Sequence, residues 1–562
     1  MITGKKQKYF LFENYRITKV ILMAVITMTL FMACSNNTES LTQDQQDDQA
    51  VHTEGDLGEV NFNVPCNGAV REDFDYALGM MHHMMYETSR ELFEDIIEAD
   101  PNCAMGYWGI ATTLFQPLWS TRPSEEDMQK GSDLIKQAQD LVDSEREELL
   151  IESTAAFFGE PETADLSDRL QSWADIMEVA YEAYPDDHDI AALYGLTRLS
   201  NAQFVENRDP LHDEAEAVLR DIFKQEPKHP GAIHYSIHAT DVDGQAENAL
   251  DMVDAYGEIA PDVPHALHMA SHIYVRLGDW PEVIEWNSRS AEAALDHPVN
   301  GAESHHYIHA IDYMVYGHLQ RGEEDEAEAA FAEALDRDKH QASFISAFHL
   351  AAIPARLAVE QQNWEQAIAL EPRTPEYLPW DDSPWAEGLT WYARGLGSIH
   401  TGDLEGAQEA ERQLEQFSEQ AKENGDEGMA KYIQIDRHVL AGRIAHAQGE
   451  DNRAVEMTQA AADMEETIEK HPVTPGALLP PYEALGILLT DLERHEEALE
   501  AFEASDEIWP NRYYTLAGAA RAAELADNQQ IAQQYYEKLL ATTGDTNREE
   551  VREAEGFMAG VQ

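Results

Sequence analysis

From residue 66 onward, apolar side chains recur every three or four positions, as they do on one face of an α-helix. Short segments that contain Gly, Pro, Asp and Asn, residues that favour turns, separate these amphipathic stretches. The sequence lacks the strict alternation of apolar and polar residues that is typical of a half-buried β-strand. The pattern therefore predicts an all-α chain in which short loops join successive helices.

The turns between these helices repeat with a regular chemistry. Gly244 and Gly278 lie 34 residues apart, and so do Pro227 and Pro261. A proline at such a position ends a helix, because it has no N–H to continue the hydrogen-bond ladder. Many turns are followed by an alanine that allows the next helix to pack closely: Ala327, Ala367, Ala407, Ala454, Ala498 and Ala532. A repeat of this length predicts helix–turn–helix units that stack into a solenoid.

These units resemble the tetratricopeptide repeat (TPR) over most of residues 70–545. The resemblance implies a right-handed superhelix, in which the first helix of each unit lines a concave face that receives ligands. The segments DPNCAMGYWG (residues 100–109) and PHALHMASHIY (residues 264–274) are similar to segments of a group of exported bacterial repeat proteins. This similarity implies an architecture and no particular activity. We expect an N-terminal TPR array at 66–370, a Pro-rich connection at 371–384, a C-terminal array at 385–545 and a tail at 546–562.

The N-terminus has the features of an export signal. Five basic residues precede an apolar run at 20–33, which is shorter than the ~20 residues that span a bilayer. The run ends in LFMAC (residues 30–34) and continues into SNNT, which resembles a bacterial lipoprotein signal. The resemblance implies removal of residues 1–33 and lipidation of Cys34, with an acidic, flexible tether at 34–65. An uncleaved anchor or an ordinary signal peptide is the alternative.

The remaining cysteines agree with export. Cys66 and Cys103 form an even pair, which in an oxidising compartment favours a disulfide over two free buried thiols. We therefore expect a protein of the bacterial cell envelope that is lipid-anchored. Ser35 after the lipidated cysteine favours the outer membrane, by resemblance to other lipoproteins.

Charge narrows the range of partners. The 562-residue chain has 38 Lys and Arg against 107 Asp and Glu, a net charge of −69. Nucleic-acid binding requires clustered Lys and Arg, so the sequence excludes a nucleic-acid partner. The same charge disfavours an anionic membrane surface, so we expect membrane contact only through the lipid. A large carboxylate excess keeps a protein soluble and is best tolerated where salt screens the repulsion.

Histidine is concentrated in one part of the chain and follows the repeat. Eleven of the 23 histidines lie between residues 229 and 318. Two pairs lie ten and six residues before the glycines at 244 and 278, respectively: His234 with His238, and His268 with His272. Spacings of three and four residues place side chains on one stripe of a helix. The TPR resemblance implies that this stripe faces the concave groove.

A histidine pair at i and i+4 can chelate one metal ion, because both imidazoles project from the same side of the helix. Packed helices lie ~8–10 Å apart, so pairs from adjacent helices can meet around an ion. We predict metal ligands, or groups that orient them, at His234, His238, His265, His268, His272, His305, His309, Asp241 and Asp312. Imidazole-rich sites favour transition metals such as Zn, Cu or Fe. Other residues expected in the groove are His82, His349 and Arg356.

Two functions fit these observations. The first is a cell-envelope scaffold that binds a protein or peptide through its His-rich concave groove without a metal. The alternative is a metal-dependent enzyme or metal-binding protein with a His-ligated centre in the same groove. A third interpretation of the histidines is structural hydrogen bonding alone. The spacing of the candidate acids and bases does not identify a catalytic residue, so enzymatic activity stays open.

Overall fold

The computed structural model describes residues 57–119, 123–160, 163–205 and 207–561. The predicted signal peptide, the lipidation site at Cys34 and most of the predicted tether lie outside these residues. The described residues contain α-helices and three 3-10 helices (η1 Gly68–Val70, η2 Ala246–Ala249, η3 Trp380–Asp382), and no β-strand. The predicted all-α class is therefore confirmed.

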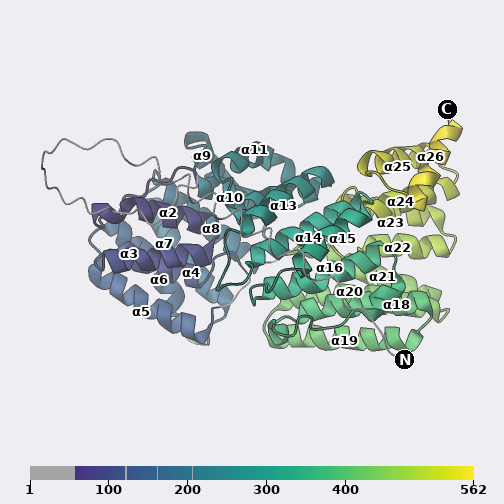
Figure 1. The fold of residues 1–562 in the computed structure, drawn as a ribbon, viewed down its shortest axis with the longest axis horizontal. Helices are drawn as coiled ribbons and strands as arrows, with labels where there is room; N and C mark the ends of the chain where they lie inside the picture. Colours follow the sequence, from purple (N-terminus) through teal and green to yellow (C-terminus); the bar gives the residue numbers. More distant parts are fainter. Residues whose placement is uncertain (1–56, 120–122, 161–162, 206, 562) are drawn as a thin grey trace, which may run out of the picture. The chain divides into compact units, whose positions relative to one another are not determined.

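Helices α2 to α25 form consecutive helix–turn–helix pairs, and α26 follows the last pair (Figure 1). The first helices of the pairs are α2 (Arg71–His82), α4 (Ala104–Leu114), α6 (Glu145–Gly159), α8 (His188–Ala202), α10 (Pro230–Thr240), α12 (Pro264–Leu277), α14 (His305–Gln320), α16 (Phe344–Glu360), α18 (Pro384–Thr401), α20 (Glu427–Ala447), α22 (Pro481–Asp491) and α24 (Tyr513–Leu525). The second helices are α3 (Tyr86–Ala99), α5 (Glu125–Leu141), α7 (Leu166–Ala183), α9 (Asp209–Gln225), α11 (Leu250–Ile259), α13 (Trp280–Ala294), α15 (Glu324–Leu335), α17 (Trp364–Ala369), α19 (Leu404–Glu423), α21 (Asp451–Glu465), α23 (His495–Ile508) and α25 (Gln529–Thr542). Each helix packs against its neighbours in sequence, as expected for a TPR-type array.

The turn between α12 and α13 illustrates how the sequence sets the pairing. Gly278 ends α12 in the left-handed conformation, with φ +64°, which favours a residue without a Cβ. Pro281 stands at the start of α13, where the missing N–H costs nothing. The two helices are therefore reversed within two residues, and Trp280 and Val283 of α13 are buried.

The Pro-rich segment at 371–384 joins helices without interrupting the core. Its Leu378 and Trp380 are buried in the same apolar cluster as Phe348 of α16 and Trp385 of α18. This cluster extends from Ala291 to Ala484. The packing therefore continues from one predicted array into the next.

Both ends of the described chain are more structured than the sequence suggested. Leu57, Phe62 and Val64, in the last part of the predicted tether, are buried against the first helices, so this part is packed rather than free. Cys66 and Cys103 form a disulfide, which is the predicted pairing. The predicted tail at 546–562 contains α26 (Glu549–Val561), whose Val551 and Ala554 lie three residues apart and are buried together.

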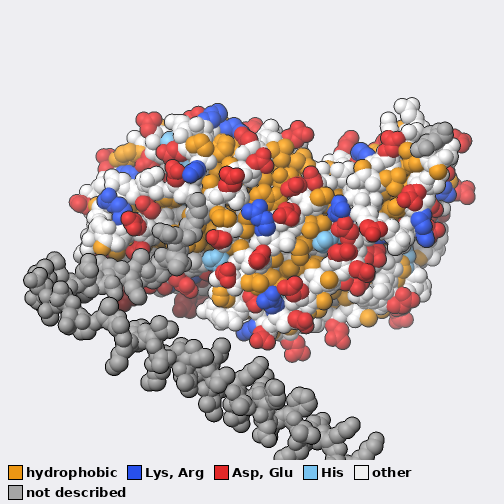
Figure 2. Space-filling view, turned by 45° about the horizontal axis from the view of Figure 1, so that its top comes forward, with side chains coloured by type: hydrophobic (Ala, Val, Ile, Leu, Met, Phe, Trp, Pro, Cys, Tyr) orange, Lys and Arg blue, Asp and Glu red, His pale blue; other side chains and the backbone are white. Residues whose placement is uncertain are grey.

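The exposed surface carries the acidic excess. Carboxylates are spread over the face drawn in Figure 2 and outnumber the Lys and Arg side chains there. In the part of the chain that the structure describes, no helix is both long and apolar enough to cross a membrane.

Candidate metal centre

The predicted histidine stripe is brought together by the first helices of four successive pairs, α10, α12, α14 and α16. Their imidazoles stack in a continuous cluster, with ring centroids 5.0 Å apart for His234 and His265, 4.1 Å for His268 and His309, and 4.6 Å for His309 and His349. These rings are buried, and His268 is 1% exposed. The fold therefore brings the predicted stripe together. The side chains form a buried cluster, however, and not the lining of an open groove.

Within this cluster, His268, His272 and His309 form a triad that fits a metal ion. One ring nitrogen of each lies within 4.8 Å of the corresponding atoms of the other two. His268 and His272 are an i,i+4 pair on α12, and His309 reaches them from α14. The predicted pair on α12 is thus completed to a triad by a histidine of α14, the first helix of the following helix pair.

Hydrogen bonds around the triad assign the ring protons of the pair on α12. The Asn287 amide donates to the Val283 carbonyl (2.7 Å), so its oxygen accepts a bond from His268 Nδ1–H (2.7 Å). His272 Nδ1–H donates to the Asp241 carboxylate (2.9 Å). A neutral imidazole carries one proton, so Nε2 of both histidines is left with a lone pair. These two Nε2 atoms face each other at 2.9 Å.

The third histidine is assigned through a relay. His349 Nδ1–H donates to the Asp312 carboxylate (2.9 Å), so His349 Nε2 accepts a bond from His309 Nδ1–H (2.6 Å). Asp312 also accepts a bond from Arg356 (3.0 Å) and remains a carboxylate. His309 therefore has its lone pair on Nε2. All three triad histidines carry the free lone pair on the same ring atom, away from the groups that orient them.

The electrostatics of the triad keep its imidazoles neutral. Lone pairs that face each other at 2.9 Å repel unless a proton or a metal ion lies between them. Burial, with the neighbouring histidines, holds the pKa of His268 and His309 well below the ordinary value, and burial also lowers the pKa of His272. A shared proton is therefore disfavoured. Two nitrogens on one tetrahedral ion are separated by about 3.3 Å when each bond is ~2.0–2.1 Å, close to the distance here.

A second triad, His234, His238 and His265, lies beside the first. Its ligand atoms also lie within 4.8 Å of one another. His234 Nδ1–H donates to the backbone carbonyl of His82 (2.6 Å), which leaves its Nε2 as an acceptor. Within the described residues, His234 Nε2, His238 Nε2 and both ring nitrogens of His265 lack a hydrogen-bond partner. The His265 and His268 rings are 6.1 Å apart, so the two triads adjoin.

A third group, His82, Asp189 and His229, contains a hydrogen-bond network centred on His82. His82 Nε2 lies 3.2 Å from the Asp189 carboxylate, and its Nδ1 lies 3.1 Å from the Tyr235 hydroxyl. His229 Nδ1 accepts a backbone N–H, which directs its Nε2–H toward Asp189 at 3.4 Å. Both ring nitrogens of His82 are therefore engaged, whereas His229 Nε2 has no hydrogen-bond partner among the described residues. We therefore assign His82 to structural hydrogen bonding and not to the predicted groove.

The two predicted acidic ligands have a different role. Asp241 accepts from His272 and Arg276 (2.8 Å), and Asp312 accepts from His349 and Arg356. Both carboxylates are buried and each is held by an arginine. They orient histidines and offset the arginine charge, which was one of the two roles that the sequence left open.

His305 and Arg356 also lie elsewhere than expected. The His305 ring lies against Trp119 (5.2 Å) and His306 (4.5 Å), outside all three groups, although its nitrogens are buried without a hydrogen-bond partner among the described residues. Arg356 is 1% exposed and therefore does not present its charge to an open groove. Tight packing of the stripe explains both differences.

A small cavity of about 80 Å³ adjoins the triads. His238, His265, His272 and His309 line it, and residues from distant parts of the chain close it: Met84, Leu118, Trp119, Phe344, Ile345, His471, Pro472 and Val473. A cavity of this size accommodates one or more water molecules. Sequence reasoning missed Asn287, His306 and His471. His306 has a signal in the sequence, because it lies next to His305, whereas the other two lie outside the stripe.

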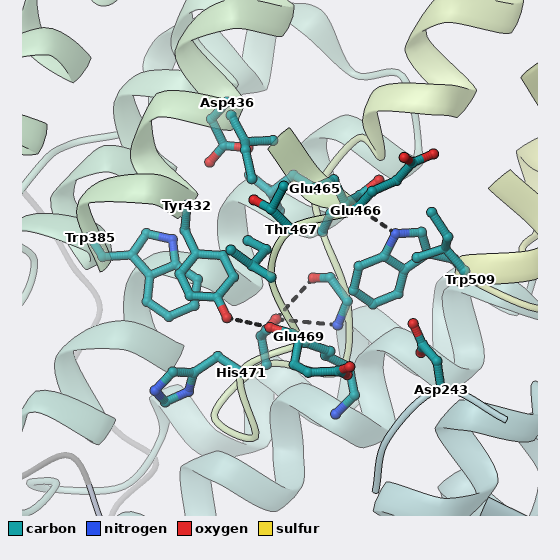
Figure 3. A pocket seen from close by; sticks show the side chains of 18 of the residues that line it. Asp243, Trp385, Tyr432, Asp436, Glu465, Glu466, Thr467, Glu469, His471 and Trp509 are labelled. Atoms are coloured by element: carbon teal, nitrogen blue, oxygen red, sulfur yellow. Dashed lines mark hydrogen bonds between the residues drawn. The ribbon is translucent and has the colours of Figure 1, made fainter. Parts of the chain in front are cut away.

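A larger pocket of about 400 Å³ lies next to this cavity and shares His471 with it (Figure 3). Its lining includes Trp385, Tyr432 and Trp509, together with several carboxylates. Its lining comes from α12, α16, α18 and α20, from the segment around the start of α9, and from the ends of α21 and α23 with the loops after α10, α21 and α23. No periodic pattern in the sequence indicates this pocket, because its walls come from separate repeats.

Comparisons with known proteins add little to this description. No protein-family model matches the chain, and no curated protein matches it. Human IFIT1 as a dimer with m7Gppp-AAAA is 13% identical, with 79% of this chain and 90% of that chain covered and a TM-score of 0.35. The Cut9 and Hcn1 hetero-tetramer of APC/C is 12% identical, with 87% and 96% covered and a TM-score of 0.28. The element order itself defines the class: an all-helical repeat protein of TPR-type helix–turn–helix pairs.

Proposed function

We propose that this protein binds a transition-metal ion through His268, His272 and His309. One observation carries the proposal: each of these histidines has its Nδ1–H committed to an acceptor, while the Nε2 atoms of His268 and His272 face each other at 2.9 Å and a ring nitrogen of His309 lies within 4.8 Å of the candidate ligand atoms of both. Groups that fix the tautomer of a ligand in this way are typical of protein metal sites. Three imidazoles favour Zn²⁺, Cu²⁺ or Fe²⁺ over Mg²⁺ or Ca²⁺.

The proposed site has room for a further ligand. Three protein ligands leave a tetrahedral ion with one open position, which in catalytic zinc sites is taken by water or substrate. The cavity of about 80 Å³ is lined by His272 and His309 and can supply this water. The centre is therefore of the open type that supports chemistry, and it differs from a closed structural site.

The test is metal content. The chain should be produced without a His tag, exposed separately to Zn²⁺, Cu²⁺ and Fe²⁺, freed of excess ion and analysed by elemental mass spectrometry. We expect at least one tightly bound ion per chain and its loss in the His268→Ala/His272→Ala variant. His446→Ala is the control, because His446 is partly exposed and its Nδ1 pairs with Asp451 on the surface, away from the histidine cluster. Absence of bound metal in the wild type, or unchanged binding in the double variant, would refute the proposal.

We also propose that the chain is exported and anchored by a lipid on Cys34. The LFMAC sequence supports this, and so does the disulfide between Cys66 and Cys103, because such bonds persist in oxidising compartments. The expected location is the bacterial cell envelope at the outer membrane. Cys34→Ser should move the protein from the membrane to the soluble fraction, whereas Cys66→Ser/Cys103→Ser should leave fractionation unchanged. Equal membrane association of Cys34→Ser would contradict the anchor.

Ligand binding by the repeat scaffold is a second candidate function. The pocket of about 400 Å³ beside the histidine cluster favours it, because a cavity of this volume accepts a small molecule or a side chain of a protein or peptide. The chemistry of that pocket is specific enough to suggest a class of ligand.

A further inference from the structure

The pocket of about 400 Å³ has two aromatic walls. Trp385 of α18 and Tyr432 of α20 stack with ring centroids 4.6 Å apart. Figure 3 shows this pair on one side of the pocket and Trp509 on the opposite side. The faces of such rings attract cations, because the ring quadrupole is negative there.

Carboxylates also line this pocket. The lining contains six acidic residues, Asp209, Asp243, Asp436, Glu465, Glu466 and Glu469, against four basic ones, Arg208, Arg276, Arg356 and Lys470. Glu465, the last residue of α21, is the most informative. Its Oε1 accepts a bond from Trp509 Nε1–H (2.9 Å), whereas its Oε2 is buried and has no hydrogen-bond partner among the described residues. The side chain is 7% exposed, and burial raises the pKa of Glu465 to about 7.

Three of the basic residues are already engaged elsewhere. Arg276 pairs with Asp241 (2.8 Å) and Glu469 (3.2 Å), and Arg356 pairs with Asp312 (3.0 Å). Lys470 lies 3.5 Å from Asp241. These cations therefore offset the carboxylates that orient the histidines. None forms an ion pair with Glu465 in the described part of the chain, so the free oxygen of Glu465 lacks a positively charged partner.

We infer that this pocket binds an organic cation, with its ammonium or guanidinium group at Glu465 and an apolar body between Trp385 and Trp509. A positive N–H donor satisfies the buried Glu465 oxygen, and the aromatic faces stabilise the same charge. A free amine and a Lys or Arg side chain of a peptide share this chemistry. The inference does not rest on the proposed metal, because Glu465 is absent from both histidine triads.

Binding should be measured by isothermal titration calorimetry with four probes of similar shape: benzylamine, benzyltrimethylammonium, benzyl alcohol and benzoate. We expect benzylamine to bind at least tenfold more tightly than benzyl alcohol and benzoate. Benzyltrimethylammonium has the charge without an N–H, so its position in the series separates attraction to the rings from the hydrogen bond. Equal or tighter binding of benzoate would overturn the inference, since the basic residues would then dominate the pocket. No binding of either cation would also overturn it.

The matched variants are Glu465→Gln and Glu419→Gln. In Glu465→Gln the new side chain keeps an acceptor for Trp509 but loses the charge, so we expect benzylamine affinity to fall at least tenfold. Glu419 is exposed on α19, and its change should have no effect. Unchanged affinity in Glu465→Gln would refute the assignment. Should that variant fail to fold, judged by circular dichroism, the probe series on the wild type still decides.

One further comparison distinguishes a free amine from a peptide side chain as the ligand, and another distinguishes the cation pocket from the proposed metal site. A blocked Gly-Lys-Gly peptide that binds tenfold more tightly than benzylamine identifies a peptide side chain as the ligand, and the reverse order identifies a free amine. The titrations are run on chelator-treated and on Zn²⁺-loaded protein. If benzylamine binds equally to both samples, the inference stands even when no metal binds. If benzylamine binds to neither sample, the inference is refuted, and the proposed metal site is unaffected.

Discussion

His349 is the side chain on which the tautomer of the proposed third ligand depends. It donates from Nδ1 to Asp312 and accepts at Nε2 from His309, so the carboxylate determines which nitrogen of His309 keeps its lone pair. Asp312 is in turn held by Arg356. The proposed ligand atom of His309 is therefore oriented through three residues that are not themselves proposed ligands, and such outer groups tune metal affinity in proteins.

Replacing His349 should weaken the metal site without removing a ligand. In His349→Leu the Nδ1–H of His309 loses its acceptor, and the imidazole can present either nitrogen to the ion. We expect Zn²⁺ affinity to fall by about 10–100-fold. Competition with a chromogenic chelator measures this. His340→Leu is the control, because His340 is also a buried histidine but bonds to the Ala334 carbonyl outside the cluster. Equal affinities in the two variants would show that the relay has no role.

The buried histidines also make stability depend on pH, and His83 isolates this effect. Its Nε2–H donates to the Leu57 carbonyl (3.1 Å) and its Nδ1 accepts from the Tyr256 hydroxyl (2.9 Å). Burial lowers the pKa of His83 to about 3. The unfolded chain has the ordinary pKa of about 6.5, so below that pH it binds a proton that the folded chain does not. This contribution to stability is complete above pH ~6.5 and is lost as the pH falls toward 3.

His83→Gln should therefore flatten the pH dependence of unfolding. Each pH unit below ~6.5 costs the wild type about 1.4 kcal/mol through this group, or about 2 kcal/mol between pH 6.5 and pH 5. The variant lacks this pH-dependent contribution of His83 to stability, although its stability at neutral pH is lower than that of the wild type. Urea unfolding at several pH values in the presence of a chelator measures the difference. Parallel curves for the two proteins would show that His83 does not stay neutral in the fold.

At the scale of elements, local signals predicted most of the fold. Turn glycines and the prolines that follow helices determine where pairs reverse, and these residues act within one or two positions of themselves. The α26 helix lies in the predicted tail, although four of its apolar side chains follow the spacing of one helix face and pack against the last pair: Val551, Ala554, Phe557 and Met558. Phe62 and Val64 lie in a short segment outside the helical pattern, and their burial depends on packing against the first helices.

The turns differ in what lies next to them, and Gly278 and Gly402 form a matched pair. Both end a helix in the left-handed conformation, with φ +64° and φ +80°. A Cβ on Gly278 would lie 2.5 Å from the Pro510 carbonyl oxygen, whereas a Cβ on Gly402 would meet nothing within 4 Å. The backbone cost, ~1 kcal/mol, is common to both alanine variants.

Gly278→Ala should therefore destabilise the protein more than Gly402→Ala. The additional loss of stability arises because the new Cβ pushes the α12–α13 turn away from the loop that contains Pro510 and Asn511. Trp280 Nε1–H donates to the Asn511 carbonyl (2.8 Å) across this contact. We expect an extra ~1–3 kcal/mol, as for overpacking of a tight contact. Guanidinium unfolding of both variants provides the comparison. An equal decrease in the free energy of unfolding for the two variants would mean that the turn and the Pro510 loop can move apart without destabilising the protein.

At the scale of the whole molecule, the site depends on contacts that no local pattern contains. The histidine stripe can be predicted from the sequence because the same spacing of histidines repeats on successive first helices. Asn287 belongs to the facing helix α13, and His471 reaches the cavity from a loop almost 200 residues after His272. The packing of α12 against α14 determines which histidines share a triad. The periodicity of the sequence does not specify how these two helices are shifted along each other. The large pocket escaped prediction for the same reason.

Arg512 links several of the repeats through one buried charge. It donates to Glu360 of α16 (2.8 Å), Glu483 of α22 (3.1 Å) and the Tyr316 hydroxyl of α14 (2.8 Å), and it is 1% exposed. Burial acts against its charge, but the two glutamates raise the pKa of Arg512 well above its ordinary value. Loss of the arginine would leave two carboxylates in the interior without a cation.

We therefore expect Arg512→Met to destabilise the chain by about 3–5 kcal/mol, because the cost lies in the unpaired acids rather than in the lost bonds. Arg512→Met combined with Glu360→Gln and Glu483→Gln should recover much of that loss, since no charge is then left buried. Arg521→Met is the control: its pair with Glu524 is exposed, and its loss should cost at most about 0.5 kcal/mol. Urea unfolding of the four proteins decides the point. A triple variant no more stable than Arg512→Met would show that Arg512 stabilises the fold by its hydrogen bonds and packing, and not by neutralising the acids.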